Sequence, residues 1–439
     1  MSTGALILML VASAFVVIIL GVPVYASLGF VGAISLVVLT VTKGTPLSWI
    51  VVPSSIYNGA TQITLLAIPF YIFAGEMMNK GGITKKLVDF ALLLIGRFPA
   101  SLAQANIVSS MFFGGITGSA QADTASIGGL LIPAMMDEGY SAEEAIGVTA
   151  SSSTCGPIIP PSIMMVVYGV AVGCSIGALF MGGFIPGLLI GLGLMITVAI
   201  RDRKHHFPRR TEKYTKEQRL KIIKDGLLPL GMPIIIFGGI MGGIFTATEA
   251  GAAAVAYSLV VGLFISKTIK LKDIYPMLLK SATMSATVLL IIACAKIFSY
   301  ALATLQMSTI VANAILSLTS NKYVFLLLVN IVLLIMGMFM DGSAAVILLA
   351  PILMPVASAM GISTLHFGVI MVLNLIIGCG TPPLGACLFI ASKVAGVPVE
   401  RGVKGMVPYL IAEMIVLLLV TYVPFTVEWF PTVMGYSLV

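Results

Sequence analysis

Two stretches of this sequence carry residue types that could bind a small cation inside a membrane. In each, a Gly-Ser turn precedes a glycine-containing break in an apolar run, and the spacing from Gly118 to Gly156 equals that from Gly342 to Gly380. A constant shift in residue number, the one from Gly118 to Gly342, therefore relates the two stretches. Paired turns and interrupted helices of this kind are the best sequence indication of a transport site near the middle of a bilayer.

Oxygen atoms are the ligands that both stretches offer. Hydroxyl groups and the backbone carbonyls freed at a break suit a hard monovalent cation, because hard ions prefer oxygen. The C-terminal ends of half-helices add partial negative charge. The hydroxyl candidates are Ser119, Ser153, Thr154, Ser343 and Thr381, and the carbonyl candidates are Gly156, Pro157, Gly378 and Gly380. The alternative interpretation is that these small residues only let helices pack closely.

Anion binding is predicted at the same place. The helices that begin after Ala120 and Ser343 would point their N-terminal ends at an anionic group such as a carboxylate. One arrangement can therefore hold a cation and an organic anion side by side.

Several charged side chains stand in or beside apolar runs, where ionisable groups usually have a function. Asp341 is predicted either to ligate a cation or to cap the helix that follows it, and Asp123 to cap a helix or join a polar network. The breaks at 151–161 and 378–385 contain no carboxylate, so we predict Na⁺ rather than protons as the coupling ion. The sequence leaves ion pairing, snorkelling and function open for Glu76, Glu249, Lys296 and Glu413.

Composition identifies the class of protein that must position these groups. Of the 439 residues, 59% are hydrophobic and 9% are charged, and the mean hydropathy is +1.11. In soluble domains about a quarter of the residues are charged. Long apolar runs without strand-like alternation predict an all-α polytopic membrane protein. Ten of the 24 Lys and Arg residues fall in 201–224, which places that segment in the cytoplasm.

We predict about ten transmembrane helices, two re-entrant helical hairpins and two broken helices. The two halves then have inverted topology, as in many secondary transporters. The hairpins are expected at about 99–136 and 322–360, and the broken helices at 142–169 and 364–392. Amphipathic or interfacial pieces are expected at 43–58, 83–98, 270–280 and 308–320, with spans at 283–305 and about 405–427.

Enzymatic and redox functions find little support in the sequence. The segment 173–177 matches the GxSxG pattern of hydrolases, but it ends an apolar helix and has no strand or His–acid pair. No phosphate-binding loop of the ATPase type occurs. The five cysteines show no CxxC spacing, so no disulfide, metal cluster or cofactor is expected besides the coupling ion. An ion channel is a further alternative, which the paired broken helices disfavour.

The sequence resembles the DctM-like large membrane subunit of tripartite ATP-independent periplasmic (TRAP) transporters over essentially its whole length. The motifs that carry the resemblance are GGITGSAQADTASIGGLLIPAM (114–135), CGPIIPPS (155–162) and IGCGTPPLG (377–385). It implies sodium-driven, elevator-type uptake of an organic acid, such as sialic acid or a C4-dicarboxylate, across the bacterial inner membrane. It also implies two partners, a small four-helix membrane subunit and a periplasmic substrate-binding protein. A stand-alone anion symporter driven by Na⁺ or protons is the nearest alternative.

The same resemblance implies roles for residues and segments. The first cation site would draw on Ser119, Ser153, Thr154, Gly156 and Pro157, and the second on Asp341, Ser343, Gly378, Gly380 and Thr381. The substrate would bind between them, at Thr117, Gly118, Ser119, Gly342 and Pro382. Scaffold helices are expected at 1–61 and 226–282, transport repeats at 62–200 and 283–439, and a basic cytoplasmic loop at 201–225.

Overall fold

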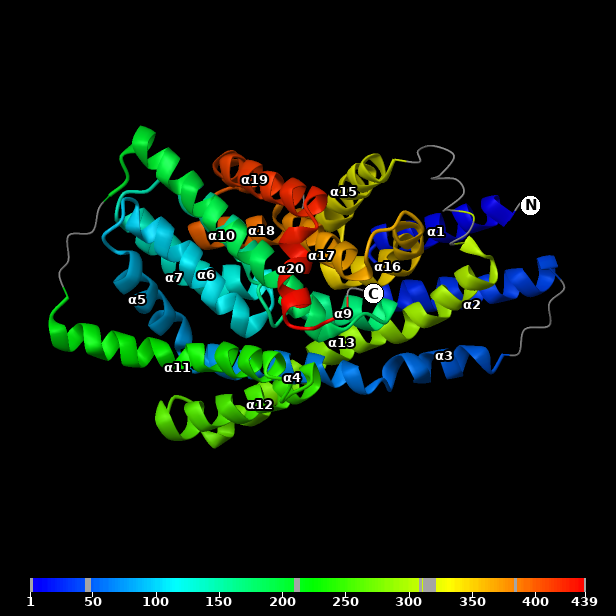
Figure 1. Ribbon diagram of the computed structural model, residues 1–439, viewed down its shortest axis with the longest axis horizontal. Helices are drawn as coiled ribbons and strands as arrows, with labels where there is room; N and C mark the ends of the chain where they lie inside the picture. Colours follow the sequence, from blue (N-terminus) through cyan, green and yellow to red (C-terminus); the bar gives the residue numbers. More distant parts are fainter. Residues whose placement is uncertain are drawn as a thin grey trace.

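The computed structural model describes residues 3–43, 49–208, 214–307, 310, 321–382 and 385–437, and every regular element in these ranges is a helix (Figure 1). The all-α membrane fold predicted from composition is confirmed. Among the described residues, seven helices are long and apolar enough to cross a membrane, or eight if one bent pair counts as a single span.

The N-terminal part consists of helices that precede the first hairpin. Gly21 lies in the turn between the first two helices, with a φ of +88° that glycine adopts without a Cβ clash. The chain bends by 49° between the third helix and the short 3-10 helix that follows it. These elements are α1 (Thr3–Ile19), α2 (Val24–Lys43), α3 (Val51–Ala60), η1 (Ile63–Leu66), α4 (Ala67–Lys80) and α5 (Ile83–Ile95). The last of them matches the amphipathic helix predicted at 83–98.

The first hairpin and the first broken helix lie within a few residues of their predicted positions. Hairpin 1 is α6 (Ser101–Thr117) and α7 (Ala120–Asp137), and the broken helix is α8 (Ala142–Ser152), η2 (Ser153–Cys155) and α9 (Ile163–Val172). α10 (Ile176–His205) follows. A capping box between Thr215 and Gln218 then starts α11 (Lys216–Met241). The connection between the halves is therefore 206–215, which is shorter than the basic loop predicted at 201–225.

The second half repeats this order. Hairpin 2 and the second broken helix again lie within a few residues of their predicted positions. The elements are α12 (Ala247–Val260), the π-helical turn η3 (Val261–Ile265), α13 (Leu271–Thr304), α15 (Lys322–Phe339), α16 (Gly342–Ala359), α17 (Thr364–Gly380), α18 (Ala386–Ala395), α19 (Val399–Tyr422) and α20 (Phe425–Val433). Hairpin 2 is formed by α15 and α16, and the second broken helix by α17 and α18.

The predicted division between an amphipathic piece at 270–280 and a span at 283–305 is wrong. α13 is one continuous helix of 34 residues. Neither Gly nor Pro occurs between 277 and 304 to stop it, and the hydroxyls of Thr283 and Ser285 bond to carbonyls of the preceding turn. The predicted domain boundary at 282/283 falls inside this helix. The interfacial helix predicted at 308–320 lies outside the described residues, apart from Ile310.

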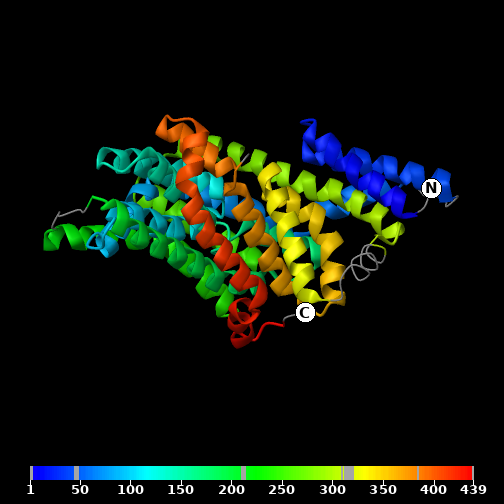
Figure 2. The ribbon, with the colours of Figure 1, turned by 90° about the horizontal axis from the view of Figure 1, so that it is seen from above.

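Packing separates most of the helices into two groups. In the first group α13 packs against α2 and α3, and α12 packs against α4 and α11. In the second group α8 packs against α19, α7 against α18, and α9 against α16. Figure 1 shows α3, α4, α11 and α12 along the lower edge and α15 and α19 along the upper edge. In Figure 2, α13 runs beside the N-terminal helices. The hairpin tips lie where the two groups meet.

Candidate functional site

The tip of hairpin 1 is a tight turn at Gly118 and Ser119. Gly118 has a left-handed φ of +61°, and a Cβ on it would lie 2.6 Å from the carbonyl oxygen of Pro161. Only glycine meets both conditions. Ser119 caps α7, because its hydroxyl accepts a hydrogen bond from the Ala122 backbone N–H at 3.4 Å. The turn therefore presents the partially positive end of α7 at the tip.

The tip of hairpin 2 is capped by a carboxylate. Oδ1 of Asp341 accepts hydrogen bonds from the backbone N–H groups of Ser343 at 2.9 Å and Ala344 at 3.3 Å. Of the two roles predicted for Asp341, the structure shows the helix cap, while cation ligation stays a prediction. Gly342 lies so close to Met164 that a Cβ on it would come within 1.8 Å of the Met164 Cε atom. This contact places the tip of hairpin 2 against the first broken helix.

The first break is buried from residue 151 to residue 162. Three prolines within 157–161 provide no backbone N–H, so the helix cannot continue through them. The predicted ligands Ser153, Thr154 and Gly156 all lie in this buried stretch. A Cβ on Gly114 of α6 would lie 2.2 Å from the Gly156 Cα atom. Backbone contact between these two glycines therefore holds the break against hairpin 1.

The second break is built in a similar way. α17 ends at Gly380, and the Thr381 hydroxyl donates a hydrogen bond to the Ile377 carbonyl at 2.7 Å. A Cβ on Gly378 would lie 2.8 Å from the Cα atom of Gly337 in α15. A glycine pair thus holds each break against the first helix of its own hairpin. Residues 383–384 of the break lie outside the described residues.

The two breaks also lie against each other. A Cβ on Gly380 would come within 3.6 Å of the Thr154 Cγ2 atom. Nε2 of Gln121, at the start of α7, donates a hydrogen bond to the Cys379 Sγ atom at 3.3 Å. Groups from opposite halves of the chain therefore form one site.

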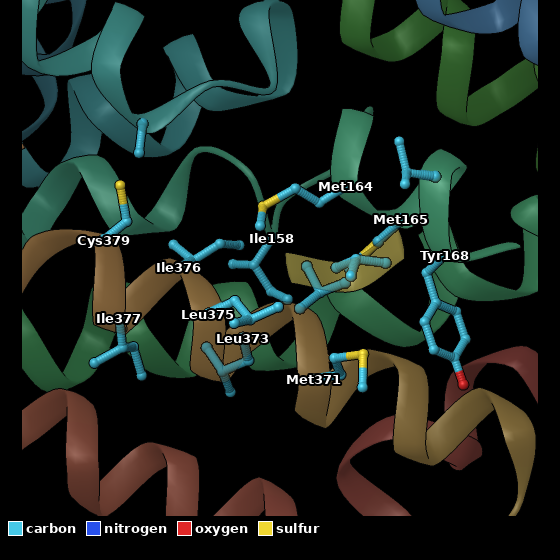
Figure 3. Close-up of a cluster of buried hydrophobic side chains, with 14 of the residues drawn as sticks. Ile158, Met164, Met165, Tyr168, Met371, Leu373, Leu375, Ile376, Ile377 and Cys379 are labelled. Carbon is cyan, nitrogen blue, oxygen red and sulfur yellow. The ribbon is translucent and has the colours of Figure 1, made fainter. Parts of the chain in front are cut away.

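Apolar side chains fill the space between α9 and α17 (Figure 3). Ile158 and Met164 lie toward Leu375 and Ile376 of α17, and all four side chains are buried. Because a close-packed interior resists displacement, this packing fixes the polar groups of the two breaks relative to each other.

A cavity of about 510 Å³ opens at the two tips. Three of the predicted substrate residues line this cavity, namely Gly118, Ser119 and Gly342. The other two do not: Thr117 is buried next to Gly118, and Pro382 is half-buried. Of the predicted cation ligands, the cavity is lined by Ser119, Pro157, Asp341 and Ser343. The remaining ligands lie in the buried breaks behind these residues.

The opposite wall of this cavity comes from α4 and α13. It includes Glu76, Asn79, Lys280, Met284 and Val288. The Nζ atom of Lys280 lies 2.8 Å from both carboxylate oxygens of Glu76. Glu76 was one of the charged residues that the sequence left open, and the structure places it in an ion pair at the cavity.

The other open residues lie in different surroundings. Glu249 is exposed and completes a capping box with Thr246 at the start of α12. Glu413 is fully buried on α19, and its Oε1 atom lies within hydrogen-bond distance, 2.7 Å, of the Thr154 hydroxyl oxygen. Lys296 is half-buried on α13 and lines a second, smaller cavity.

Buried asparagines join each hairpin to its broken helix, although the sequence analysis did not single them out. Asn106 of α6 donates a hydrogen bond to the Thr149 hydroxyl of α8 at 2.7 Å. In the second repeat, Asn374 of α17 donates to the side-chain oxygen of Asn330 in α15 at 2.7 Å. The constant shift between the repeats also relates Asn106 to Asn330. Extending the repeat comparison upstream of the tips would have identified this pair.

Two acidic side chains flank the first break. Asp123 in the first turn of α7 is fully buried, with the hydroxyls of Ser110 and Ser153 nearby. Neither of its carboxylate oxygens has a hydrogen-bond partner of normal geometry among the described residues. The second acidic side chain, Glu413 of α19, contacts the break at the Thr154 hydroxyl. The break contains no carboxylate, as the sequence showed, but the fold brings carboxyl groups to it from other helices.

Comparisons with known proteins agree with this architecture. The family model described as "Tripartite ATP-independent periplasmic transporter, DctM component" matches residues 11–426. The chain is 38% identical to the sialic acid TRAP transporter large permease protein SiaM of Vibrio cholerae, covering 92% of this chain and 93% of that protein. It is also 38% identical to the C4-dicarboxylate TRAP transporter large permease protein DctM of Pseudomonas aeruginosa, covering 94% and 95%.

A solved structure also has a similar fold. The YdaH transporter of Alcanivorax borkumensis matches with a TM-score of 0.57 over 84% of this chain and 86% of that chain, at 15% sequence identity. At that level of identity the match supports the fold alone.

Proposed function

Because the chain belongs to the DctM family of TRAP transporter components, we propose that it mediates sodium-coupled uptake of a small organic acid. It is a multi-pass protein of the bacterial inner membrane, and it is a transport permease rather than an enzyme. Family membership also implies a periplasmic binding protein and a small membrane subunit as partners. The observation that carries the proposal is the convergence of two helix N-termini and two unwound breaks at one cavity.

The donor atoms at the breaks suit Na⁺. Buried hydroxyls of Ser153, Thr154 and Thr381 and the carbonyls of the unwound segments supply oxygen ligands without a cluster of formal charges. No group of three or more His, Cys, Asp or Glu residues that could hold a metal ion occurs in the described part of the chain. Such a group would favour a divalent or transition metal, whereas hydroxyls and carbonyls favour a weakly held monovalent cation.

Recognition of the anion is assigned to the tips. The N-termini of α7 and α16 both reach the 510 Å³ cavity through Ser119, Gly342 and Ser343. Partial positive charge at helix N-termini attracts carboxylates. The relatives are named for sialic acid and for C4-dicarboxylates, and both substrates carry a carboxylate. The proposal therefore names the substrate class and leaves the particular acid open.

An elevator movement of the hairpins past a static scaffold is part of the proposal. Within the second group, Glu144 of α8 accepts a hydrogen bond from Tyr409 of α19, and it also forms an ion pair with Arg201 of α10. α4 packs against α12 and α13, and α13 packs against α2 and α3. We therefore assign α4 and α13 to the scaffold, although the sequence-based division assigned 62–80 and 283–304 to the transport repeats.

Uptake into proteoliposomes tests this function. Vesicles that contain the chain and its small subunit would receive the binding protein with radiolabelled sialic acid or succinate, under an inward Na⁺ gradient. We expect accumulation of one of the acids only when both Na⁺ and the binding protein are present. Full-rate uptake in sodium-free buffer with a pH gradient would contradict sodium coupling. Full-rate uptake without the binding protein would instead identify a stand-alone symporter.

A further inference from the structure

α13 lines two separate cavities on the side that faces the hairpins. Lys280, Met284 and Val288 line the 510 Å³ cavity at the tips. Further along the helix, Ile292 and Lys296 line a second cavity of about 80 Å³. These five residues follow one another at intervals of four, so they form a continuous stripe along the helix. The stripe carries one ammonium group at each end.

Lys296 has surroundings that are unusual for a charged side chain. It is half-buried in an apolar stretch of α13, and the other walls of its cavity are α9 and α16, through residues such as Val167 and Ile347. A Cβ on Gly59 of α3 would lie 3.0 Å from the Lys296 Cγ atom, so the stem of the lysine packs across that glycine. Among the described residues Lys296 has no hydrogen-bond or ion-pair partner. An unpaired ammonium inside a membrane span is costly and marks a function.

The position of α16 connects the two cavities. Its first residues, Gly342 and Ser343, face the large cavity beside Val288, while Ile347 and Pro351 face the small cavity beside Lys296. α16 therefore runs along the stripe. At 1.5 Å of rise per residue, the level of Lys296 lies about 12 Å beyond Val288 and about 24 Å beyond Lys280. A shift of hairpin 2 by about 12 Å along α13 would bring its tip to Lys296.

In this structure Lys280 faces the cavity at the hairpin tips. We propose that Lys296 binds the carboxylate of the substrate in a second state, in which the hairpin tips have moved along α13 to the position of Lys296. This inference rests on the proposed uptake of an organic acid and on movement of the hairpins along α13. Lys280 lies at the end nearer the basic segment around Lys270 and Lys272, which the positive-inside rule places in the cytoplasm. Lys296 is therefore the contact for substrate that enters from the periplasm.

The two lysines differ in whether an acidic side chain already pairs with the ammonium group. Lys280 is paired with Glu76, and its side chain is 58% exposed, so the pair is weak and water can replace either partner. Lys296 has no such partner in the described structure. Loss of its charge should therefore weaken the capture of an anion more than loss of the Lys280 charge.

The test compares three variants on the same helix in proteoliposomes, with binding protein and either radiolabelled sialic acid or succinate as the probe. We expect Lys296→Gln to raise the KM for the delivered acid on the order of tenfold, the effect of one lost charged hydrogen bond. The kcat and the Na⁺ half-saturation should stay near their wild-type values. Lys296→Arg should restore most of the KM, because it keeps the charge. Lys272→Gln is the matched control, since Lys272 is exposed outside both cavities.

The outcomes separate this inference from the proposed function. If the wild type accumulates an acid and Lys296→Gln has the wild-type KM, Lys296 does not bind substrate. The inference also fails if Lys296→Gln lowers only kcat and Lys296→Arg does not restore it, because that pattern describes a structural side chain. If the wild type accumulates neither acid under a Na⁺ gradient, the proposed function itself fails. Size-exclusion profiles and melting temperatures of each variant identify folding defects.

Discussion

Glu413→Gln is expected to leave both the fold and sodium-driven uptake intact. The Thr154 hydroxyl lies 2.7 Å from the Ser151 carbonyl oxygen and also 2.7 Å from the Glu413 Oε1 atom. A threonine hydroxyl has one proton to donate, and a backbone carbonyl can only accept. Both contacts are therefore satisfied together when Glu413 is protonated and donates to the Thr154 Oγ1 atom. A glutamine amide offers a donor at the same position.

The expected magnitudes follow from this geometry. Glu413→Gln should change the free energy of unfolding by less than about 1 kcal/mol, because one neutral hydrogen bond replaces another. Thr154→Val should cost about 1–3 kcal/mol, because it leaves a fully buried polar group without its partner. Thr197→Val is the control: within the described part of the chain, the Thr197 hydroxyl bonds only to the Gly193 carbonyl of its own helix, at 2.9 Å. We expect that control to change stability by no more than about 0.5 kcal/mol.

Two measurements check the protonation of Glu413. Thermal unfolding of the purified variants gives the stability differences, and uptake at graded Na⁺ concentrations gives the Na⁺ half-saturation. A Glu413→Gln variant whose Na⁺ half-saturation rises about tenfold or more would show that an ionised carboxylate is required, which would refute the reasoning. Unchanged stability of Thr154→Val would show that the hydrogen bond between Thr154 and Glu413 is absent.

Two further predictions concern the hairpin tips. Asp341→Ala should lower stability by about 1 kcal/mol through loss of the α16 cap, whereas Asp341→Asn should keep the cap. A raised Na⁺ half-saturation of Asp341→Asn would then report cation binding, and a wild-type value would leave Asp341 with the capping role alone. Gly118→Ala should abolish uptake, because its φ of +61° and the nearby Pro161 carbonyl cost at least about 1–2 kcal/mol. Gly129→Ala, where a Cβ would meet nothing within 4 Å, is the matched control for transport assays.

Local signals explain why the tips and breaks could be predicted from the sequence. Gly118 ends α6, and the prolines at 157–161 end the first half of the broken helix, each within a residue or two of the expected position. Both effects act on the backbone within one turn. The division of α13 failed because it relied on a change of composition near residue 281. Charged residues at one end of a helix alter its surroundings, but they do not interrupt its hydrogen bonds.

The contacts that the sequence analysis missed join residues far apart in the chain. Thr154 and Glu413 are 259 positions apart, and no periodicity links a buried acid on α19 to a break after α8. The absence of carboxylates within the breaks was correct, yet it did not show which acids the fold would bring there. The wall of α4 and α13 was missed for the same reason, since only packing reveals that both helices face the tips.

Charge at the two predicted cation sites is more balanced than the hairpin tips alone indicate. Asp341 occupies the position in the second repeat that Thr117 occupies in the first, so hairpin 2 carries an acid where hairpin 1 has a hydroxyl. Asp123 supplies the corresponding carboxylate from the first turn of α7, but it is fully buried, whereas Asp341 is exposed at the cavity. A carboxylate buried without a partner needs a cation or a proton far more than one that is capped and hydrated. If both predicted sites bind a cation, as proposed, we expect the first to hold it more firmly and the second to exchange it through the open cavity.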